Sequence, residues 1–191
     1  MGRGAKTGLI IVAIILIVVL GSYSYIKGMY NSLVTLDEGV TAAWAQVENQ
    51  LQRRMDLIPN YVETVKGYAR HEREVFLKVT EARAKVAGAG SIKDKIAANS
   101  ELTAALSRLL LVVERYPDLK ANQNFMRLQD ELAGTENRIA VERRRYNEAV
   151  RAYNVRIRRF PINIFAGIFG FTRAAFFEAA EAAKEPPKVK F

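Results

Sequence analysis

Residues of the types that carry chemistry are scarce in this chain, and their spacing does not build a catalytic site. His71 is the only histidine among 191 residues, so the stretch His71–Val75 lacks the second histidine of a zinc-protease helix. The sequence has no cysteine, which excludes disulfides, thiolate catalysis and cysteine-ligated zinc or iron–sulfur sites. We therefore predict that the protein is not an enzyme and that it has no catalytic, cofactor-binding or metal-binding residues.

Two weaker patterns lead to the same prediction. Five glutamates are of the type that ligates metal inside a helical bundle: Glu48, Glu63, Glu72, Glu136 and Glu142. Di-iron bundles use Glu-x-x-His pairs, which are absent from this sequence. The stretch Gly88-Ala89-Gly90-Ser91 lacks the preceding strand and the full spacing of a phosphate-binding loop, so we interpret it as a helix end and a linker.

The basic residues raise nucleic acid as a possible partner, because the net charge is +9. Arginines cluster in Arg143–Arg145 and Arg156–Arg159, but Glu136, Glu142 and Glu148 alternate with them. This alternation is typical of an exposed, salt-bridged helix and not of a one-sided phosphate footprint. We expect no nucleic-acid partner and favour the anionic headgroups of a lipid bilayer.

An apolar run near the N-terminus predicts a membrane anchor. Leu9–Leu20 holds twelve residues without a polar side chain, and the uncharged stretch around it extends to 19 residues. A bilayer core of about 30 Å needs roughly 20 helical residues. An aromatic belt and a water boundary are expected at its far end, at Tyr23, Tyr25 and Lys27. We predict a short basic tail over residues 1–8 and a transmembrane helix over residues 9–27.

A cleavable signal peptide is the alternative, because basic residues, an apolar core and Ser22-Tyr23-Ser24 match that pattern. The anchor is favoured because the apolar character continues through Tyr25 and Ile26. Arg3 and Lys6 favour an extracytoplasmic domain over a cytoplasmic one. Basic residues on the far side of the anchor argue the other way: Lys27, Arg156, Arg158, Arg159 and Arg173.

The rest of the chain has helical periodicity and no sustained strand pattern. Apolar residues recur by threes and fours in four stretches: Leu33–Ile58, Val62–Val86, Ile92–Val113 and Phe125–Phe160. Breaks are expected between and after them at Pro59, Gly88 and Gly90, Tyr116–Asp118 and Pro161. Ser91 and Asp94 predict a capping box for the third helix, and Asp118 an N-cap for the fourth. The predicted fold is all-α, with an N-terminal transmembrane helix followed by an antiparallel four-helix bundle of long helices over residues 28–160 and Trp44 in its core.

The stretch of residues 160–171 predicts a second membrane contact. It has no charge and four phenylalanines, and its 12 residues are too few to span a bilayer. An apolar, aromatic stretch beside arginines suits the headgroup region. The predicted membrane-contact residues are Tyr23, Tyr25, Lys27, Arg156, Arg158, Arg159, Phe160, Phe165, Phe169 and Phe171. The alternative is that the stretch packs over the base of the bundle or between protomers. Residues 161–191 are expected to form this membrane-proximal segment and a flexible C-terminal tail.

Amide side chains lie near the apolar stripes at unusual density: Asn49, Gln50, Asn60, Asn122, Asn124, Asn137 and Asn147. If they are buried, they must be paired. They either fix the register of the helices or form a polar groove for the backbone of a partner.

Several motifs resemble the LemA family. They are Leu36-Asp37-Glu38, the stretch Ala43–Arg54, Asp56–Asn60, Tyr116–Asn122, Leu128–Leu132, Thr135–Ala140, Arg144–Asn147 and Arg158–Pro161. The resemblance covers nearly the whole chain, although the alanine- and glutamate-rich tail after Phe171 departs from it. It implies a bacterial membrane-anchored helical bundle and supplies no activity. Family members are found near membrane metalloproteases or TPM-domain proteins, which hints at quality control in the envelope.

These observations together predict a non-enzymatic scaffold, adaptor or assembly protein of the bacterial cell envelope. We expect a single-pass protein of the inner membrane that forms homo-oligomers, with a membrane protease or another envelope protein as a further partner. The alternative is an accessory subunit or regulator of a membrane protease or transporter.

Overall fold

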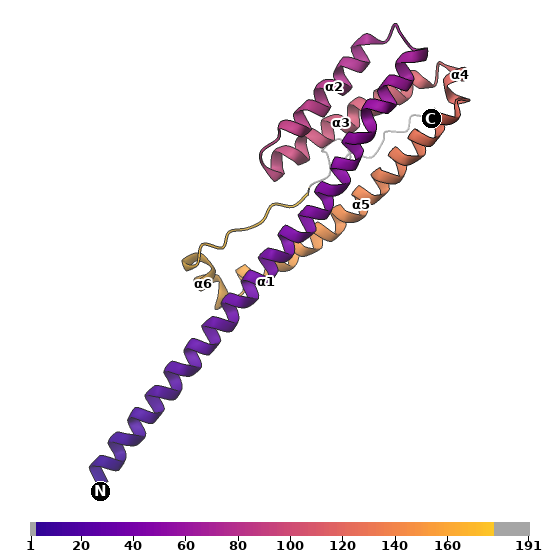
Figure 1. Ribbon diagram of the computed structural model, residues 1–191. Helices are drawn as coiled ribbons and strands as arrows, with labels where there is room; N and C mark the ends of the chain where they lie inside the picture. The colour runs from indigo at the N-terminus through magenta and orange to yellow at the C-terminus, as the bar shows by residue number, and fades with distance from the viewer. Residues whose placement is uncertain (1–2, 178–191) are drawn as a thin grey trace, which may run out of the picture. The chain divides into compact units, whose positions relative to one another are not determined.

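The computed structural model describes residues 3–177, with side chains from residue 8 onward. Every regular element in this range is a helix, which confirms the all-α class. The helices are α1 (Arg3–Tyr68), α2 (Arg73–Gly88), α3 (Ile92–Val113), α4 (Pro117–Lys120), α5 (Gln123–Arg158) and α6 (Ile162–Ile168) (Figure 1). The predicted flexible tail lies outside the described residues from residue 178 on, as do Met1 and Gly2 of the predicted basic tail.

The chain divides into two compact units. Of the described residues, unit 1 holds residues 3–41 together with Ala149–Ala174, and unit 2 holds Ala42–Glu148 together with residues 175–177. The helices α1 and α5 each contribute residues to both units.

Unit 1 combines an exposed apolar stretch with a small core. Each large apolar side chain from Leu9 to Leu20 is more than half exposed. Farther along the chain, side chains of α1, α5 and α6 are buried: Met29, Leu33, Val40, Val150, Tyr153, Ile157, Ile162 and Ala166. Gly170, at φ +79°, ends α6, and the Phe171 amide donates to the Ala166 carbonyl at 2.9 Å. This is the Schellman arrangement, in which glycine supplies the left-handed residue.

The prediction that Pro59 separates two helices is wrong, because α1 continues through it. Proline has no N–H, so the carbonyl of Met55, four residues earlier, loses its helical donor. Nε of Arg83 in α2 replaces that donor at 3.1 Å from the Met55 oxygen. The side chains of Ile58 and Tyr61 are buried beside Pro59. Their burial and the substitute hydrogen bond offset the roughly 3 kcal/mol that an interior proline costs a helix.

Unit 2 is built around a buried cluster to which α1, α2, α3, α4 and α5 contribute. Fully buried members include Val65, Val79, Leu109, Leu119 and Phe125. Figure 1 shows α2 and α3 side by side, and an ion pair of 2.6 Å joins Lys85 to Glu101 across them. Trp44 is 7% exposed, which confirms its predicted place among buried residues.

Helix starts in unit 2 follow local capping chemistry. The capping pattern predicted at Ser91 is confirmed, because its side chain accepts a hydrogen bond of 3.1 Å from the Asp94 amide. The prediction that Asp118 caps the fourth long helix is wrong, because Asp118 lies inside the short helix α4. Asn122 takes this role, since its side-chain oxygen accepts from the amides of Asn124 and Phe125 at 2.9 and 3.1 Å.

Among the described residues, two helices are long and apolar enough to cross a membrane by length and composition. The first is the exposed N-terminal part of α1, and the second is α3. Eight residues of α3 are buried, among them Leu102, Leu106 and Leu109, so α3 has the pattern of a core helix in a folded domain.

Candidate functional site

The predicted membrane-contact residues of α1 are exposed. Tyr23, Tyr25 and Lys27 all present their side chains to the surroundings, directly after the exposed run that ends at Leu20. Phe165 of α6 shares a surface hollow with Gly21, Ser22, Tyr25 and Ile26. The helix α6 therefore lies at the level where the apolar stretch of α1 ends.

The helix α6 has one face on the protein and one face exposed. Ile162 and Ala166 are buried, whereas Ile164 and Ile168 are exposed, the latter at 71%. Phe160, just before the helix, is 81% exposed. An apolar face left open beside a candidate membrane span is the pattern of an interfacial helix.

Two of the predicted contact residues also meet the protein itself. The Tyr30 ring lies 5.1 Å from the ring of Phe169 and 5.8 Å from that of Phe171, between centroids. Such edge-on and tilted pairs contribute roughly 0.5–1.5 kcal/mol beyond their buried area. Ile164 and Ile168 were not among the residues singled out in the sequence, because only a helical arrangement shows that they share the open face.

The predicted arginines differ in their surroundings. Arg158 and Arg159 are exposed, whereas Arg156 is half-buried. Its Nε is buried and has no hydrogen-bond partner in the described part of the chain. All three lie within unit 1, as α6 does.

A second feature lies in unit 2, where Phe177 is buried in an aromatic and cationic surround. Trp44 packs edge-on against Tyr146, at 5.4 Å between ring centroids, and lies 6.3 Å from Phe177. The Arg143 guanidinium carbon lies over the Phe177 ring at 4.2 Å, which is a cation–π distance. Asn147 binds the backbone of Phe177 on both sides, accepting from its amide at 2.8 Å and donating to its carbonyl at 3.0 Å.

The amide side chains therefore serve several purposes. Asn147 holds the chain's own backbone, and Asn122 caps a helix. In unit 1, Asn154 makes the same two-sided contact with Ala174, at 2.9 and 3.0 Å. The sequence reading missed Asn154 and Asn99, which are the buried asparagines, because their neighbours give no local sign of burial.

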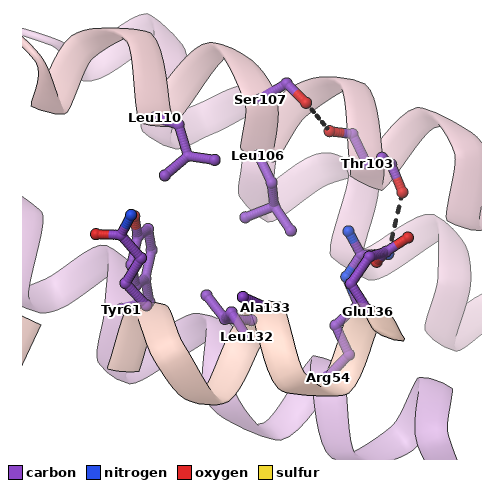
Figure 2. Close-up of a pocket in the computed structure, with 10 residues that line it drawn as sticks. Arg54, Tyr61, Thr103, Leu106, Ser107, Leu110, Leu132, Ala133 and Glu136 are labelled. Carbon is purple, nitrogen blue, oxygen red and sulfur yellow. Dashed lines mark hydrogen bonds and ion pairs between the residues drawn. The ribbon is translucent and has the colours of Figure 1, made fainter. Parts of the chain in front are cut away.

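The third feature is a buried arginine that joins α1, α3 and α5 in unit 2. Nη1 of Arg54 donates to the side-chain oxygen of Asn99 at 3.1 Å. It also donates to the hydroxyl of Thr103 at 3.0 Å and lies 3.0 Å from Oε2 of Glu136 (Figure 2). Its side chain is 6% exposed. Burial lowers the pKa of Arg54, and the charge of Glu136 partly opposes that shift. Burying the guanidinium charge of Arg54 costs free energy. The ion pair with Glu136 and the hydrogen bonds to Asn99 and Thr103 offset that cost.

Each of the five glutamates considered as metal ligands forms an ion pair instead. The pairs are Glu48 with Lys95, Glu63 with Lys66, Glu72 with Arg115, Glu136 with Arg54 and Glu142 with Arg145. Within the described residues, no group of three histidine or acidic side chains is placed to hold a metal ion. The lone histidine, His71, is exposed in the link between α1 and α2.

Comparison with known proteins supplies a family. The sequence model of the LemA family matches residues 43–191. The chain is also similar to Magnetosome protein MamQ 1 of Paramagnetospirillum magneticum, at 28% identity over 97% of this chain and 77% of that protein.

Two further relatives come from other bacteria. Magnetosome protein MamQ of Magnetospirillum gryphiswaldense is 26% identical over the same shares of the two chains. Protein LemA of Metamycoplasma hominis is 25% identical over 83% of this chain and 73% of that protein.

Proposed function

The chain belongs to the LemA family, as its sequence motifs indicate, and from this premise we propose that it is a membrane-anchored scaffold or assembly protein without enzymatic activity. The observation that carries the proposal is the exposed apolar run Leu9–Leu20 at the start of α1. In water this surface would be a strong liability, whereas a bilayer core removes it from water. The same helix supplies Trp44 and Val47 to the buried part of unit 2.

A second membrane contact through α6 is part of the proposal. It is supported by the exposed face of Phe160, Ile164 and Ile168 and by the nearness of Phe165 to Tyr25. Arg158 and Arg159 are exposed nearby in the sequence and suit anionic headgroups. The proposed form of this contact is an interfacial helix beside the anchor, which the open face of α6 supports.

The proposed working part of the protein is the helical domain beyond the anchor. We assign an antiparallel four-helix bundle to unit 2. Its four helices are the part of α1 over residues 42–68, the whole of α2, the whole of α3, and the part of α5 over residues 123–148. Self-association with parallel anchors and closed symmetry suits such a domain on one membrane. The favoured location of this domain is the extracytoplasmic side of the bacterial inner membrane.

The membrane contact of α6 is tested by site-specific fluorescence in proteoliposomes. The chain has no cysteine, so Ile168→Cys can be labelled with an environment-sensitive dye at that position alone. We expect the dye to report an apolar surround and to be quenched by spin-labelled lipid, more strongly in anionic than in zwitterionic vesicles. Gln46→Cys, at an exposed site of unit 2, is the matched control and should stay unquenched.

Absence of quenching at Ile168 would show that α6 is shielded from lipid, and equal quenching at both positions would contradict a contact that is specific to α6. The scaffold role is tested separately by light scattering in mild detergent, where only monomer over a wide concentration range would refute self-association. Repeated capture of one protease or transporter from detergent extracts would favour the accessory-subunit alternative.

A further inference from the structure

A cavity of about 270 Å³ lies within unit 2 between α1, α3 and α5. Its walls are mainly apolar and include Leu106, Leu110, Leu132 and Ala133 (Figure 2). Leu110, Ala133 and the neighbouring Ser107 are exposed, so the cavity is reached from solvent. Apolar cavities of about 150 Å³ bind molecules of the size of benzene, so this volume suits a small organic molecule.

Two residues that line the cavity have a buried polar atom without a hydrogen-bond partner among the described residues: the hydroxyl of Tyr61 and Oε2 of Glu136, which is held only as an ion pair with Arg54. Tyr61 as a whole is 1% exposed. A buried hydroxyl left unpaired costs about 1–3 kcal/mol, and native structures contain few such groups. Burial also raises the pKa of Tyr61, so the phenol keeps its proton and can donate a hydrogen bond.

The charges at the cavity cancel. Figure 2 shows Tyr61 and Glu136 on opposite sides of the leucines, with Arg54 beside Glu136. Arg54 and Glu136 form an ion pair at 3.0 Å, and Nη1 of Arg54 already donates to two acceptors, Asn99 and Thr103. An anion would meet the Glu136 carboxylate and a cation would meet the Arg54 guanidinium, so neither charge is favoured.

We infer that this cavity is a binding site for a small uncharged molecule with an apolar body and one hydroxyl or carbonyl group that pairs with the Tyr61 hydroxyl. The site is independent of the membrane contacts. Because its lining comes from three helices, an occupant bridges α1, α3 and α5 and stabilises unit 2 by mass action.

The test uses the full chain in lipid nanodiscs and four ring compounds of similar size. The probes are 4-fluorobenzyl alcohol, 4-fluorotoluene, 4-fluorobenzoate and 4-fluorobenzylammonium, with binding followed by fluorine NMR. We expect the alcohol to bind about three- to tenfold more tightly than the toluene, by the contribution of one hydrogen bond. The two charged probes should bind more weakly than both.

Comparing variants of the chain assigns the binding to the cavity. A given probe enters the lipid of the nanodisc to the same extent whichever variant is present, so a difference between variants comes from the protein. Tyr61→Phe should remove the preference for the alcohol over the toluene and leave toluene binding unchanged. Ala133→Phe should fill the cavity from an exposed position and abolish binding of both. Leu111→Phe, on an exposed part of α3 outside the cavity, should leave binding unaltered.

Three results would overturn the inference. If no probe binds above the lipid background, the cavity holds only water. Preferential binding of the benzoate would make it an anion site at Arg54. Loss of oligomers in Ala133→Phe, without any probe binding to the parent chain, would make it an interface with a second copy. Circular dichroism confirms that each variant is folded before it is compared.

Discussion

At the scale of single residues, the structure shows which side chains tie distant parts of unit 2 together. Trp44 contacts Tyr146 and Phe177, which lie about a hundred residues or more later in the chain. Arg54 reaches Asn99, Thr103 and Glu136. Stability should therefore depend strongly on a few residues of α1.

Replacing Trp44 by alanine should cost about 3–5 kcal/mol in the free energy of unfolding, because the buried ring leaves a cavity when it is removed. Urea unfolding in mild detergent, followed by circular dichroism, measures the cost, since Trp44 is the only tryptophan and its fluorescence is lost with it. Gln46→Ala, at an exposed position on the same helix, is the control and should cost under about 0.5 kcal/mol. A loss below about 1 kcal/mol for Trp44→Ala would contradict the burial described here.

Tyr61 should make unfolding sensitive to alkaline pH. Burial raises the pKa of Tyr61 to about 12 in the folded chain, from an ordinary value of 10.0. The folded state therefore keeps a proton that the unfolded state releases, so this contribution is complete below pH 10 and is lost as the pH rises from 10 to 12. The parent chain should lose about 2 kcal/mol more than Tyr61→Phe over this window in urea unfolding.

The comparison with Tyr61→Phe removes the contribution of the other titrating groups, Tyr146 among them, because both chains share these groups. Parallel stability curves for the two chains between pH 9 and pH 12 would show that Tyr61 is not buried in solution.

At the scale of elements, Ser91 is an example of a helix start that the sequence predicts, and Pro59 is an example of a helix continuation that it does not. The capping box of Ser91 and Asp94 was predictable because both partners lie within one turn. The continuity of α1 was not, because the donor that replaces the proline N–H comes from Arg83 in another helix. The cap at Asn122 was not predictable either, because Asp118 also favours a helix start and only the presence of the short helix α4 shows that the long helix begins after Asn122.

The substitute hydrogen bond can be measured with a double-mutant cycle. Arg83→Met should destabilise the parent chain by about 1–2 kcal/mol, because the Met55 carbonyl loses its donor. In a Pro59→Ala background the same change should cost about 1 kcal/mol less, because the alanine N–H now bonds that carbonyl. Equal costs in the two backgrounds would mean that Arg83 does not compensate for Pro59.

At the scale of the whole molecule, the sequence predicted the all-α class, the family and the apolar N-terminal helix. The all-α class and the apolar helix rest on periodicity and composition, whereas the family rests on the resemblance of short motifs; all of these are local properties of the chain. The cavity beside Tyr61 and the surround of Phe177 were not predictable, because each brings together residues from separate elements. The open face of α6 was not predictable either, because it depends on which residues of a short helix pack against the protein.

The central claim is that the apolar start of α1 stays in the protein as its membrane anchor. The most direct test is to wash native membranes with alkaline carbonate, recover the chain that remains, and determine its N-terminal sequence and intact mass. We predict that the chain stays in the membrane and begins upstream of Leu9. A chain released by carbonate, or one that begins near Tyr25, would show that this stretch is a cleaved signal and would contradict the account.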